Sequence, residues 1–465
     1  MGISQSCSLD RLSNLCQMHK CVTGVNGRAS DSASATDTWV CELKPDTTYR
    51  GRAISKTFMK IGINPASMPK PKKAKAGESS REATSEATSE ATTAALDRIE
   101  AATGLMYEFQ VYHNIVTPIL DANICPNFLR SYLVSYNCQY DDLLETLKIG
   151  LVKHKIPPAS VDKHLNRNIS YMYDGKDNRP AIQSTKGLVA AYPLPSLRYM
   201  VLTTEFTNVT DYWVWLGEGH SLESRRIVLL QIAIALYVMS KSKLMHNDLR
   251  APNIFVQTLP KPEYWTYAIN DYESISLYTI YLVELYDYDR GTAESLGDNA
   301  YVKDSGIYDA DLPLFEENRD LVCLYKSLTD KKLRDSSLIS KFFDVSRVNL
   351  AGEWYKGRGV EIPTSLIEGI FAIAKTLPKV KHAGQVYRIT DDMFMRDGTL
   401  NRDHENLSTL RVQNKKHELS IAEYKATLEG CNAYRRKLEM EIEDLKKRLP
   451  KEEEVFALEG LEKLD

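Results

Sequence analysis

The 465-residue sequence lacks a long hydrophobic run. No stretch approaches 18 consecutive apolar residues, and the first residues hold no apolar core of a secretory signal, so the sequence predicts neither a membrane-spanning helix nor a signal peptide. The 8 cysteines form no Cys-x-x-Cys pair, which predicts reduced thiols in the cytosol rather than a disulfide framework. The spacing of Cys16, His19 and Cys21 does not fit a zinc knuckle.

An excess of charge of either sign is also missing. Lysine and arginine number 59 and aspartate and glutamate 62, for a net charge of −3. This balance argues against a protein that binds nucleic acid through bulk positive charge, so no nucleic-acid partner is expected. The length is sufficient for two or three domains and a large core.

The most informative stretch is the octapeptide 246–253, His-Asn-Asp-Leu-Arg-Ala-Pro-Asn. An apolar segment at 222–240 predicts a buried helix before it, and Ile-Phe-Val at 254–256 predicts a strand after it. On a loop between these elements, Asp248 can accept the proton of a substrate hydroxyl. The amide oxygen of Asn253 can ligate Mg²⁺ beside nucleotide phosphates. The alternative is a polar surface loop.

The N-terminal part predicts short strands joined by turns. Gly24 to Gly27 forms a turn signal, and strands are expected at 39–43 and 58–61. Glycines in such a hairpin let the backbone approach phosphates, and Lys60 on the later strand supplies a positive charge; Lys56 is the fallback. An ordinary hairpin remains the alternative for the two glycines.

Two further segments supply partners for this lysine and for a nucleotide. A helix is expected to resume near residue 94 with an apolar stripe and with Glu108 inside it, placed to form an ion pair with Lys60. Pro118 is expected to bend that helix. Residues 198–206 predict a strand whose extended end suits hydrogen bonds to an adenine edge, with Glu205 and Thr207 as the candidate contacts.

A second metal ligand is expected after another strand, 278–285, which ends at Asp287. This aspartate can bridge Mg²⁺ to the phosphates. Asp271 is a competing candidate, disfavoured because a shorter apolar run leads into it. Near residue 318 a further buried helix begins, and its Asp320 is placed to accept backbone N–H bonds from the octapeptide loop.

Three segments lie outside this pattern. Residues 65–95 combine prolines, a lysine cluster and Glu-Ala-Thr-Ser repeats and predict a flexible insertion. Gly2 and Ser6 match an N-myristoylation pattern, with Cys7 as a second lipid site, which would bring the chain to a membrane. A heptad pattern at 404–449 predicts a coiled coil for homo- or hetero-association, or a helix packed on its own domain.

Taken in order, these strings resemble the protein-kinase fold over roughly residues 20–345, and in particular the divergent serine/threonine kinases of large nucleocytoplasmic DNA viruses, the iridovirus type. The resemblance rests on Tyr-Glu-Phe-Gln-Val-Tyr at 107–112, Cys-Pro-Asn-Phe at 125–128, the octapeptide, and Tyr-Asp-Tyr-Asp-Arg at 286–290. It implies ATP and Mg²⁺ as cofactors, a protein substrate, and a location in the host cytoplasm or virion. The implied roles are the ion pair (Lys60, Glu108), the base (Asp248) and the metal ligands (Asn253, Asp287).

The chain departs from the kinase pattern at several positions. Asn247 replaces the usual arginine, so no cation is expected there to read a phosphorylated activation segment. Arg250, a candidate catalytic residue, replaces the lysine common in the catalytic loop of serine/threonine kinases. Tyr288-Asp289 replaces the Phe-Gly that usually follows the metal-binding aspartate. His-Asn-Asp-Leu is also the spelling seen in choline-kinase-like and aminoglycoside phosphotransferases. A small-molecule kinase and a non-catalytic pseudokinase that serves as a scaffold therefore stay open.

The expected architecture is α+β and two-lobed, with a small β-rich N-lobe, a larger helical C-lobe and a long C-terminal helix. The expected boundaries are an N-terminal arm (1–20), an N-lobe (21–207) containing the insertion, a C-lobe (208–398), the coiled coil (404–449) and an acidic tail (450–465).

Overall fold

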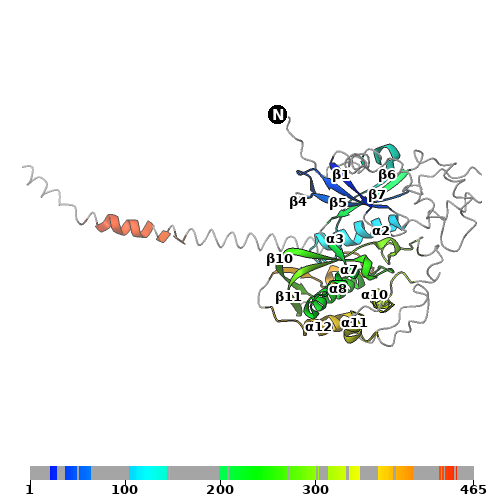
Figure 1. The fold of residues 1–465 in the computed structure, drawn as a ribbon. Helices are drawn as coiled ribbons and strands as arrows, with labels where there is room; N and C mark the ends of the chain where they lie inside the picture. The colour runs from blue at the N-terminus through cyan, green and yellow to red at the C-terminus, as the bar shows by residue number, and fades with distance from the viewer. Residues whose placement is uncertain are drawn as a thin grey trace, which may run out of the picture. The chain divides into compact units, whose positions relative to one another are not determined.

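The computed structural model describes the chain in segments and divides it into two units, residues 1–400 and 401–465. The described residues are 21–28, 37–49, 52–63, 104–143, 146, 198–206, 209–270, 272–299, 302, 313–330, 335–345, 365–380, 384–401, 429–430, 432–433, 435–444 and 447. The predicted N-terminal arm, the insertion at 65–95 and the acidic tail lie outside them. The first unit is a mixed α+β structure in which an antiparallel sheet precedes most of the helices (Figure 1).

The N-terminal sheet has five antiparallel strands in the order β1-β2-β5-β7-β6. Their bounds are β1 Val22–Arg28, β2 Asp37–Leu43, β5 Lys56–Ile63, β6 Ser131–Gln139 and β7 Arg198–Glu205, and a short hairpin joins β3 Thr48–Tyr49 to β4 Arg52–Ala53. Side chains alternate along β5: Met59 and Ile61 are buried, whereas Lys60 is partly exposed. The sheet thus presents Lys60 away from its own core.

The predicted turn at Gly24–Gly27 is wrong. Both glycines lie on β1, which pairs with β2 through register shifts between Val22 and Gly24 and between Asn26 and Arg28. Glycine inside a strand commonly accompanies such irregular pairing, so the same residues that signal a turn can also mark a bulge. The connection between β1 and β2 lies outside the described residues.

A broken helix follows and carries the predicted glutamate. It consists of α2 Leu105–Val111, a π-helical turn Tyr112–Val116 and α3 Thr117–Asp121. The N–H of Thr117 bonds to the carbonyl of Tyr112, and Pro118, which has no N–H, lies in the first turn of α3. The irregularity expected near Pro118 therefore takes the form of a π-helical turn. The predicted helix start near 94 falls outside the described residues.

The remaining part of the first unit is built around the buried helix α8 and a long hairpin. The helices are α7 Tyr212–Gly217, α8 Leu222–Lys241, α10 Arg319–Asp330, α11 Asp335–Phe343 and α12 Leu366–Ala374. The strands are β8 Val209–Asp211, β9 Leu244–Met245, β10 Ile254–Ala268, β11 Ser274–Leu285, β12 Thr292–Ala293 and β13 Gln385–Arg388. β11 pairs antiparallel and β13 parallel with β10, so this part is less helical than expected.

Helix α8 has the properties that its sequence predicts. Ser221 caps its N-terminus by accepting a bond from the N–H of Ser224, and the stretch Ile227–Leu236 is buried throughout. This helix, the predicted strand after residue 253 and the strand that ends at Leu285 enclose the octapeptide loop. The core around them takes in Trp215, Phe128 and Tyr288.

The cysteines depart in part from expectation. Cys41, Cys125 and Cys323 are free and buried, and burial raises the pKa of each thiol to about 12. Cys21 and Cys138 are each disulfide-bonded, contrary to the prediction of reduced thiols throughout. Sequence spacing could not show this, because disulfide partners are set by proximity in the fold.

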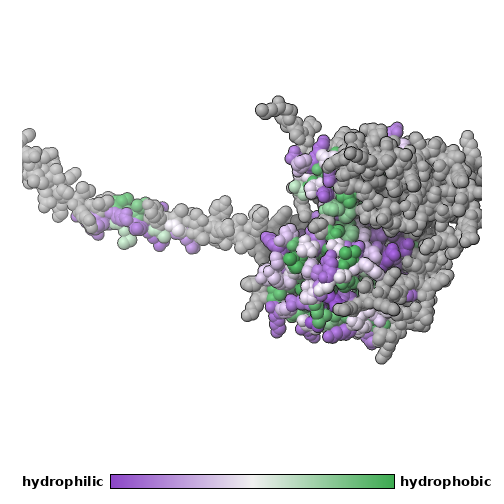
Figure 2. Space-filling view, in the orientation of Figure 1, coloured by the Kyte–Doolittle hydropathy of each residue, from purple (hydrophilic) through white to green (hydrophobic). Residues whose placement is uncertain are grey.

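In the second unit, the described residues from 429 to 447 are helical. Figure 2 shows hydrophobic and hydrophilic side chains exposed together on this helix; Leu438, Met440 and Ile442 are 40%, 73% and 52% exposed. The predicted coiled coil is not shown by these residues and stays a prediction. Among the described residues of both units, no helix is long and apolar enough to cross a membrane.

Candidate active site

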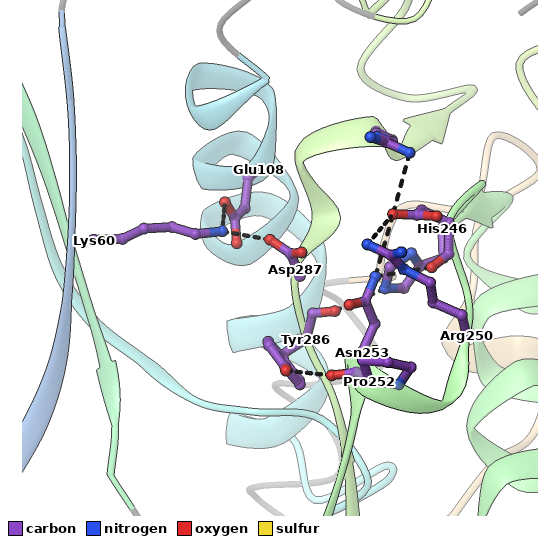
Figure 3. Close-up of polar contacts among 10 residues, drawn as sticks. Lys60, Glu108, His246, Arg250, Pro252, Asn253, Tyr286 and Asp287 are labelled. Carbon is purple, nitrogen blue, oxygen red and sulfur yellow. Dashed lines mark hydrogen bonds and ion pairs between the residues drawn. The ribbon is translucent and has the colours of Figure 1, made fainter. Parts of the chain in front are cut away.

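Lys60 joins two carboxylates from separate parts of the fold. Its Nζ lies 2.7 Å from Oε2 of Glu108 on α2 and 2.5 Å from Oδ1 of Asp287 after β11 (Figure 3). The three side chains are 17%, 2% and 26% exposed, so solvent screens the contacts only weakly. The ion pair predicted between Lys60 and Glu108 is present. Lys56, the fallback, lies over the ring of Phe206 instead, 5.4 Å from its centroid.

Close backbone packing places Glu108 within reach of Lys60. A Cβ on Gly104, the N-cap of α2, would overlap the backbone oxygen of Asp289, so the absence of a side chain lets the helix end touch the turn after β11. Beside Glu108, the hydroxyl of Tyr107 donates to the carbonyl of Gly297 and accepts from the N–H of Ala293, each at 2.8 Å. The helix is thereby fixed at two points to the segment that follows Asp287.

Lys60 and the carboxylates around it shift one another's pKa values. Burial alone would lower the pKa of Lys60, but the charges of Asp287, Glu108 and Asp289 hold it above its ordinary value. Burial raises the pKa of Glu108, opposed by Lys60. For Asp287 the ammonium outweighs burial and the pKa is lowered. Burial and the neighbouring Asp287 raise the pKa of Asp289 to about 6. The charged forms of Lys60 and Asp287 are thus both favoured in the site.

Asp287 is held in an unusual backbone conformation beside the octapeptide loop. Its φ is 72° and its ψ 59°, in the left-handed region, and a 3₁₀ turn Tyr288–Arg290 follows it. The preceding Tyr286 anchors the turn: its carbonyl contacts Nε2 of His246 at 2.7 Å and its hydroxyl donates to the carbonyl of Pro252. Such local strain recurs at functional sites, where the surrounding structure maintains it.

Asp320 holds the octapeptide loop by accepting backbone hydrogen bonds from it, as predicted. Its Oδ2 accepts the N–H of His246 at 2.7 Å, and its Oδ1 accepts the N–H of Asn247 at 2.8 Å. Asn247 has a φ of 62°, so these bonds stabilise a left-handed turn immediately before Asp248. Burial raises the pKa of Asp320, against the opposing effects of His246 and these backbone donors.

The predicted base, Asp248, is held through one of its two oxygens. Nδ2 of Asn253 donates to the Asp248 carbonyl at 2.8 Å and lies 3.4 Å from Oδ2. Arg290 Nη1 and Arg250 Nη2 lie 3.3 and 3.5 Å from the same Oδ2. No hydrogen bond or ion pair to Oδ1 comes from the parts of the chain that the structure describes. This arrangement leaves Oδ1 to accept a hydrogen bond from a substrate.

Asn247 is built into the loop rather than exposed. Its Nδ2 donates to the carbonyl of Arg290 at 3.0 Å and to Oγ1 of Thr292 at 2.9 Å, and its Oδ1 accepts from Nε of Arg319 at 3.1 Å. Arg319 is only 4% exposed. The sequence prediction of no cation at this place is therefore incomplete, since a buried guanidinium reaches it from α10.

Oxygen donors suited to Mg²⁺ are present at the expected positions. Asp287 supplies a carboxylate, and Asn253 supplies a carboxamide whose nitrogen is fixed on Asp248 while its oxygen accepts no bond from the described residues. Magnesium is commonly bound through few protein oxygens plus phosphates and water, so this donor set fits the ion. The described residues contain no group of three or more His, Cys, Asp or Glu side chains that could hold a metal alone.

Comparison with known proteins gives no family. No protein-family model matches the chain, and no curated protein matches it. Among solved structures, the chain is similar to one described as "WaaP in complex with acyl carrier protein", with 12% identity, coverage of 68% of this chain and 76% of that chain, and a TM-score of 0.27.

The other predicted contacts have mixed outcomes. Glu205 ends β7, and its N–H donates to the carbonyl of Arg130 at 2.8 Å, so this N–H is not available to an adenine edge; the predicted contact of Glu205 otherwise stays a prediction. Thr207 and Asp271 lie outside the described residues. The neighbours of Asp271 form the connection between β10 and β11, where Oδ1 of Asn270 accepts the N–H of Tyr272 at 2.9 Å.

Two arginines of the site were missed by the sequence reasoning. Arg290 directly follows the Tyr-Asp-Tyr-Asp string, and Arg319 directly precedes Asp320. The contacts of Arg290 with Asp248 and of Arg319 with Asn247 each join segments more than 40 residues apart in the chain. Their position next to predicted site residues was therefore the only sequence signal for these arginines.

Proposed function

We propose that the chain is a phosphotransferase that moves the γ-phosphoryl group of ATP to a hydroxyl acceptor. The observation that carries the proposal is the double ion pair of Lys60 with Glu108 and Asp287 beside the Asp248–Asn253 loop. A fixed ammonium, a metal-binding carboxylate and a base on one loop are the parts that phosphoryl transfer requires, since this chemistry depends mainly on positioning and charge neutralisation.

Each residue has a definite task in this mechanism. Glu108 keeps the ammonium of Lys60 in place to bind phosphate oxygens. Asp287 and Asn253 would hold Mg²⁺, which when bound neutralises phosphate charge. Arg250, the more exposed of the two arginines at Asp248, is placed to stabilise charge on the transferring group.

Asp248 acts as the base through Oδ1. The acceptor O–H bond breaks, its proton passes to Oδ1, and the acceptor oxygen bonds to the γ-phosphorus. The bond from that phosphorus to the bridging oxygen breaks, and ADP leaves with the electron pair. Holding Oδ2 by Arg290 and Asn253 directs the other oxygen to the acceptor.

The acceptor class that we propose is a serine or threonine of a protein, with support from the octapeptide's likeness to kinase catalytic loops. A small-molecule hydroxyl is the alternative within the same mechanism. Profiling ³²P transfer from [γ-³²P]ATP to casein and histone against a set of polyols and amino alcohols separates the two. Label on protein supports the first, and label only on small molecules replaces it with the second.

The test of the site itself compares two lysines of the same strand. Lys60→Met should abolish ³²P transfer. Of the ammonium groups of Lys60 and Lys56, it removes the one that contacts Glu108 and Asp287. Lys56→Met is the matched control, since this residue begins the same strand and contacts Phe206. Equal activity in the two variants would contradict the proposed site.

A further inference from the structure

Strand β11 is the end strand of the sheet β11-β10-β13, so one of its edges faces away from β10. In the half of β11 that leads to the candidate site, this outer edge is closed. Gln231 accepts the N–H of Val283 at 3.0 Å and donates to the carbonyl of Tyr281 at 2.9 Å. The N–H and the carbonyl of Leu285 bond to the backbone of the segment Asn127–Leu129. No further strand can pair with this half.

The other half of β11, next to the hairpin turn, directs different backbone groups outward. The N–H of Ile269 bonds to the carbonyl of Glu273 at 3.0 Å, so these residues form a hydrogen-bonded pair at the turn. The next pair, Ala268 and Ser274, then points its N–H and C=O groups away from each other, because the two kinds of pair alternate along an antiparallel ladder. The carbonyl of Ala268 accordingly accepts the N–H of Ile389 at 2.7 Å, on the side of β13. The backbone groups of Ser274 therefore face the outer edge.

Regular pairing with β10 carries this alternation from Ser274 to Thr279. The N–H and C=O groups of Ser276 and Tyr278 thus face the outer edge together with those of Ser274. No described residue forms a hydrogen bond with these groups. Beyond Thr279, whose hydroxyl bonds to the N–H and the carbonyl of Tyr281 at 2.9 Å each, the register shifts and the closed half begins. The stretch from 274 to 278 is an open strand edge.

The open edge lacks the features by which proteins usually prevent strand pairing. Residues 274–283 contain no charged residue, proline or glycine. Tyr278 and Ile280 are 47% and 37% exposed. Ile275 and Leu277 are buried in the core shared with α8, which lies beside β11 in Figure 1. The strand is therefore held firmly from one face, while its edge is available to a further strand.

We propose that two copies of the chain associate through this edge, by antiparallel pairing of β11 with β11 of the second copy about a twofold axis at Ser276. In this register Ser276 lies opposite the same residue of the second copy, and Ser274 lies opposite Tyr278. The three residues with outward backbone groups then all form hydrogen-bonded pairs, and the two sheets become one continuous sheet. The association goes beyond the proposed phosphotransferase function and does not depend on it.

The sequence of the strand favours this occupant and this register. An uncharged strand complements a copy of itself, since no like charges come to lie opposite each other. The register also places Tyr272, which is 96% exposed, opposite Ile280 of the second copy. An axis at Tyr278 would instead set Ser274 against the half that Gln231 closes. An axis at Ser274 would extend the pairing past the hairpin turn.

Sedimentation velocity of the full chain over a range of concentrations tests the association. The wild-type chain should pass from monomer to dimer as its concentration rises. Ser276→Lys should raise the dissociation constant at least about 10-fold, because it places like charges directly opposite each other at the axis. Thr258→Lys is the matched control, since Thr258 is exposed on β10 of the same hairpin; this variant should dimerise normally. Circular dichroism spectra that match the wild-type spectrum show that both variants are folded.

Cysteine cross-linking tests the register, and it decides the matter if Ser276→Lys does not fold. Opposite residues of a hydrogen-bonded antiparallel pair have Cα atoms about 5.5 Å apart, within the range that a disulfide spans. Under mild oxidation Ser276→Cys should therefore give a covalent dimer. Ser274→Cys changes a residue that lies opposite Tyr278, so it should give no more dimer than the wild-type chain, whose 8 cysteines set the background.

Several results would overturn the association. One is a wild-type chain that stays monomeric at every concentration, and another is a dimer that Ser276→Lys leaves intact, which would place the contact elsewhere, such as at the C-terminal helix. Equal cross-linking of the two cysteine variants would contradict the axis at Ser276. A monomeric wild-type chain whose KM for a protein substrate rises in Ser276→Lys would mean that the edge binds that substrate instead. Sedimentation and cross-linking do not use activity, so the phosphotransferase proposal stands or fails separately.

Discussion

Arg290 joins the turn of Asp287 to the proposed base: its Nη1 lies 3.3 Å from Oδ2 of Asp248. The backbone carbonyl of the same arginine accepts a bond from Asn247, so the two loops are connected twice at one residue. The geometry of the base therefore depends on a residue three positions after Asp287.

Replacing Arg290 should impair the chemical step rather than binding. Arg290→Ala removes one of the groups that hold Oδ2 of Asp248, so we expect kcat for phosphoryl transfer to fall about 10- to 100-fold with KM for ATP nearly unchanged. Arg290→Lys should restore part of the loss. Arg130→Ala is the control, because Arg130 forms a comparable ion pair with Asp121 away from the base. A rise in KM at constant kcat would contradict a positioning role.

A side chain at Gly104 should displace α2. Gly104→Ala places a methyl group against the backbone of Asp289, which cannot move without disturbing the Asp287 turn. We expect destabilisation of about 1–3 kcal/mol in urea unfolding, with a loss of phosphoryl transfer. Gly217→Ala near the end of α7 meets no atom within 4 Å and should leave stability unchanged or improved. Equal stability of the two variants would contradict the packing described for α2.

Asp289 should make stability depend on pH in a defined window. Its pKa rises from an ordinary value of 3.8 to about 6, so the folded chain binds more protons than the unfolded chain between these values. Its contribution to the free energy of unfolding is therefore fully present below about pH 4 and is lost as the pH rises to about 6. At roughly 1.4 kcal/mol per pH unit, the loss is at most about 3 kcal/mol.

Asp289→Asn removes this titration. The difference in unfolding free energy between the variant and the wild-type chain, measured in urea at intervals from pH 4 to pH 7, should shift in favour of the variant up to pH 6 and then level off. The difference is the quantity to follow, because titrating groups that do not interact with Asp289 affect both proteins alike. A difference that stays constant over this range would show that Asp289 does not titrate there.

Local patterns were enough to predict the elements that carry the site. The apolar run of α8, the strand of apolar residues around Lys60 and the apolar strand leading to Asp287 each follow from local hydrophobicity. The pairing of Lys60 with Glu108 followed from the order of these elements along the chain. Asp320 was predicted correctly because it starts a helix near a loop that needs acceptors.

Features that depend on contacts between distant segments could not be predicted in this way. The glycines at 24 and 27 lie on a strand because the segment Val22–Arg28 pairs with β2, and pairing overrides the local turn preference. Arg319 reaches Asn247 only because α10 packs below the loop. The engagement of Glu205 with Arg130 likewise comes from the entry to β6, a segment about 75 residues away.

The most direct test of phosphoryl transfer is the rate of ³²P transfer from saturating [γ-³²P]ATP with Mg²⁺ to the acceptor panel, by the wild-type chain and by Asp287→Asn. Asp287 contacts Lys60 and supplies the carboxylate proposed for the metal, so its conversion to an amide should reduce transfer at least about 100-fold. The account is supported if the wild-type chain transfers ³²P and Asp287→Asn does so at least about 100-fold more slowly. Absence of transfer by the wild-type chain, or an equal rate in the variant, would contradict it.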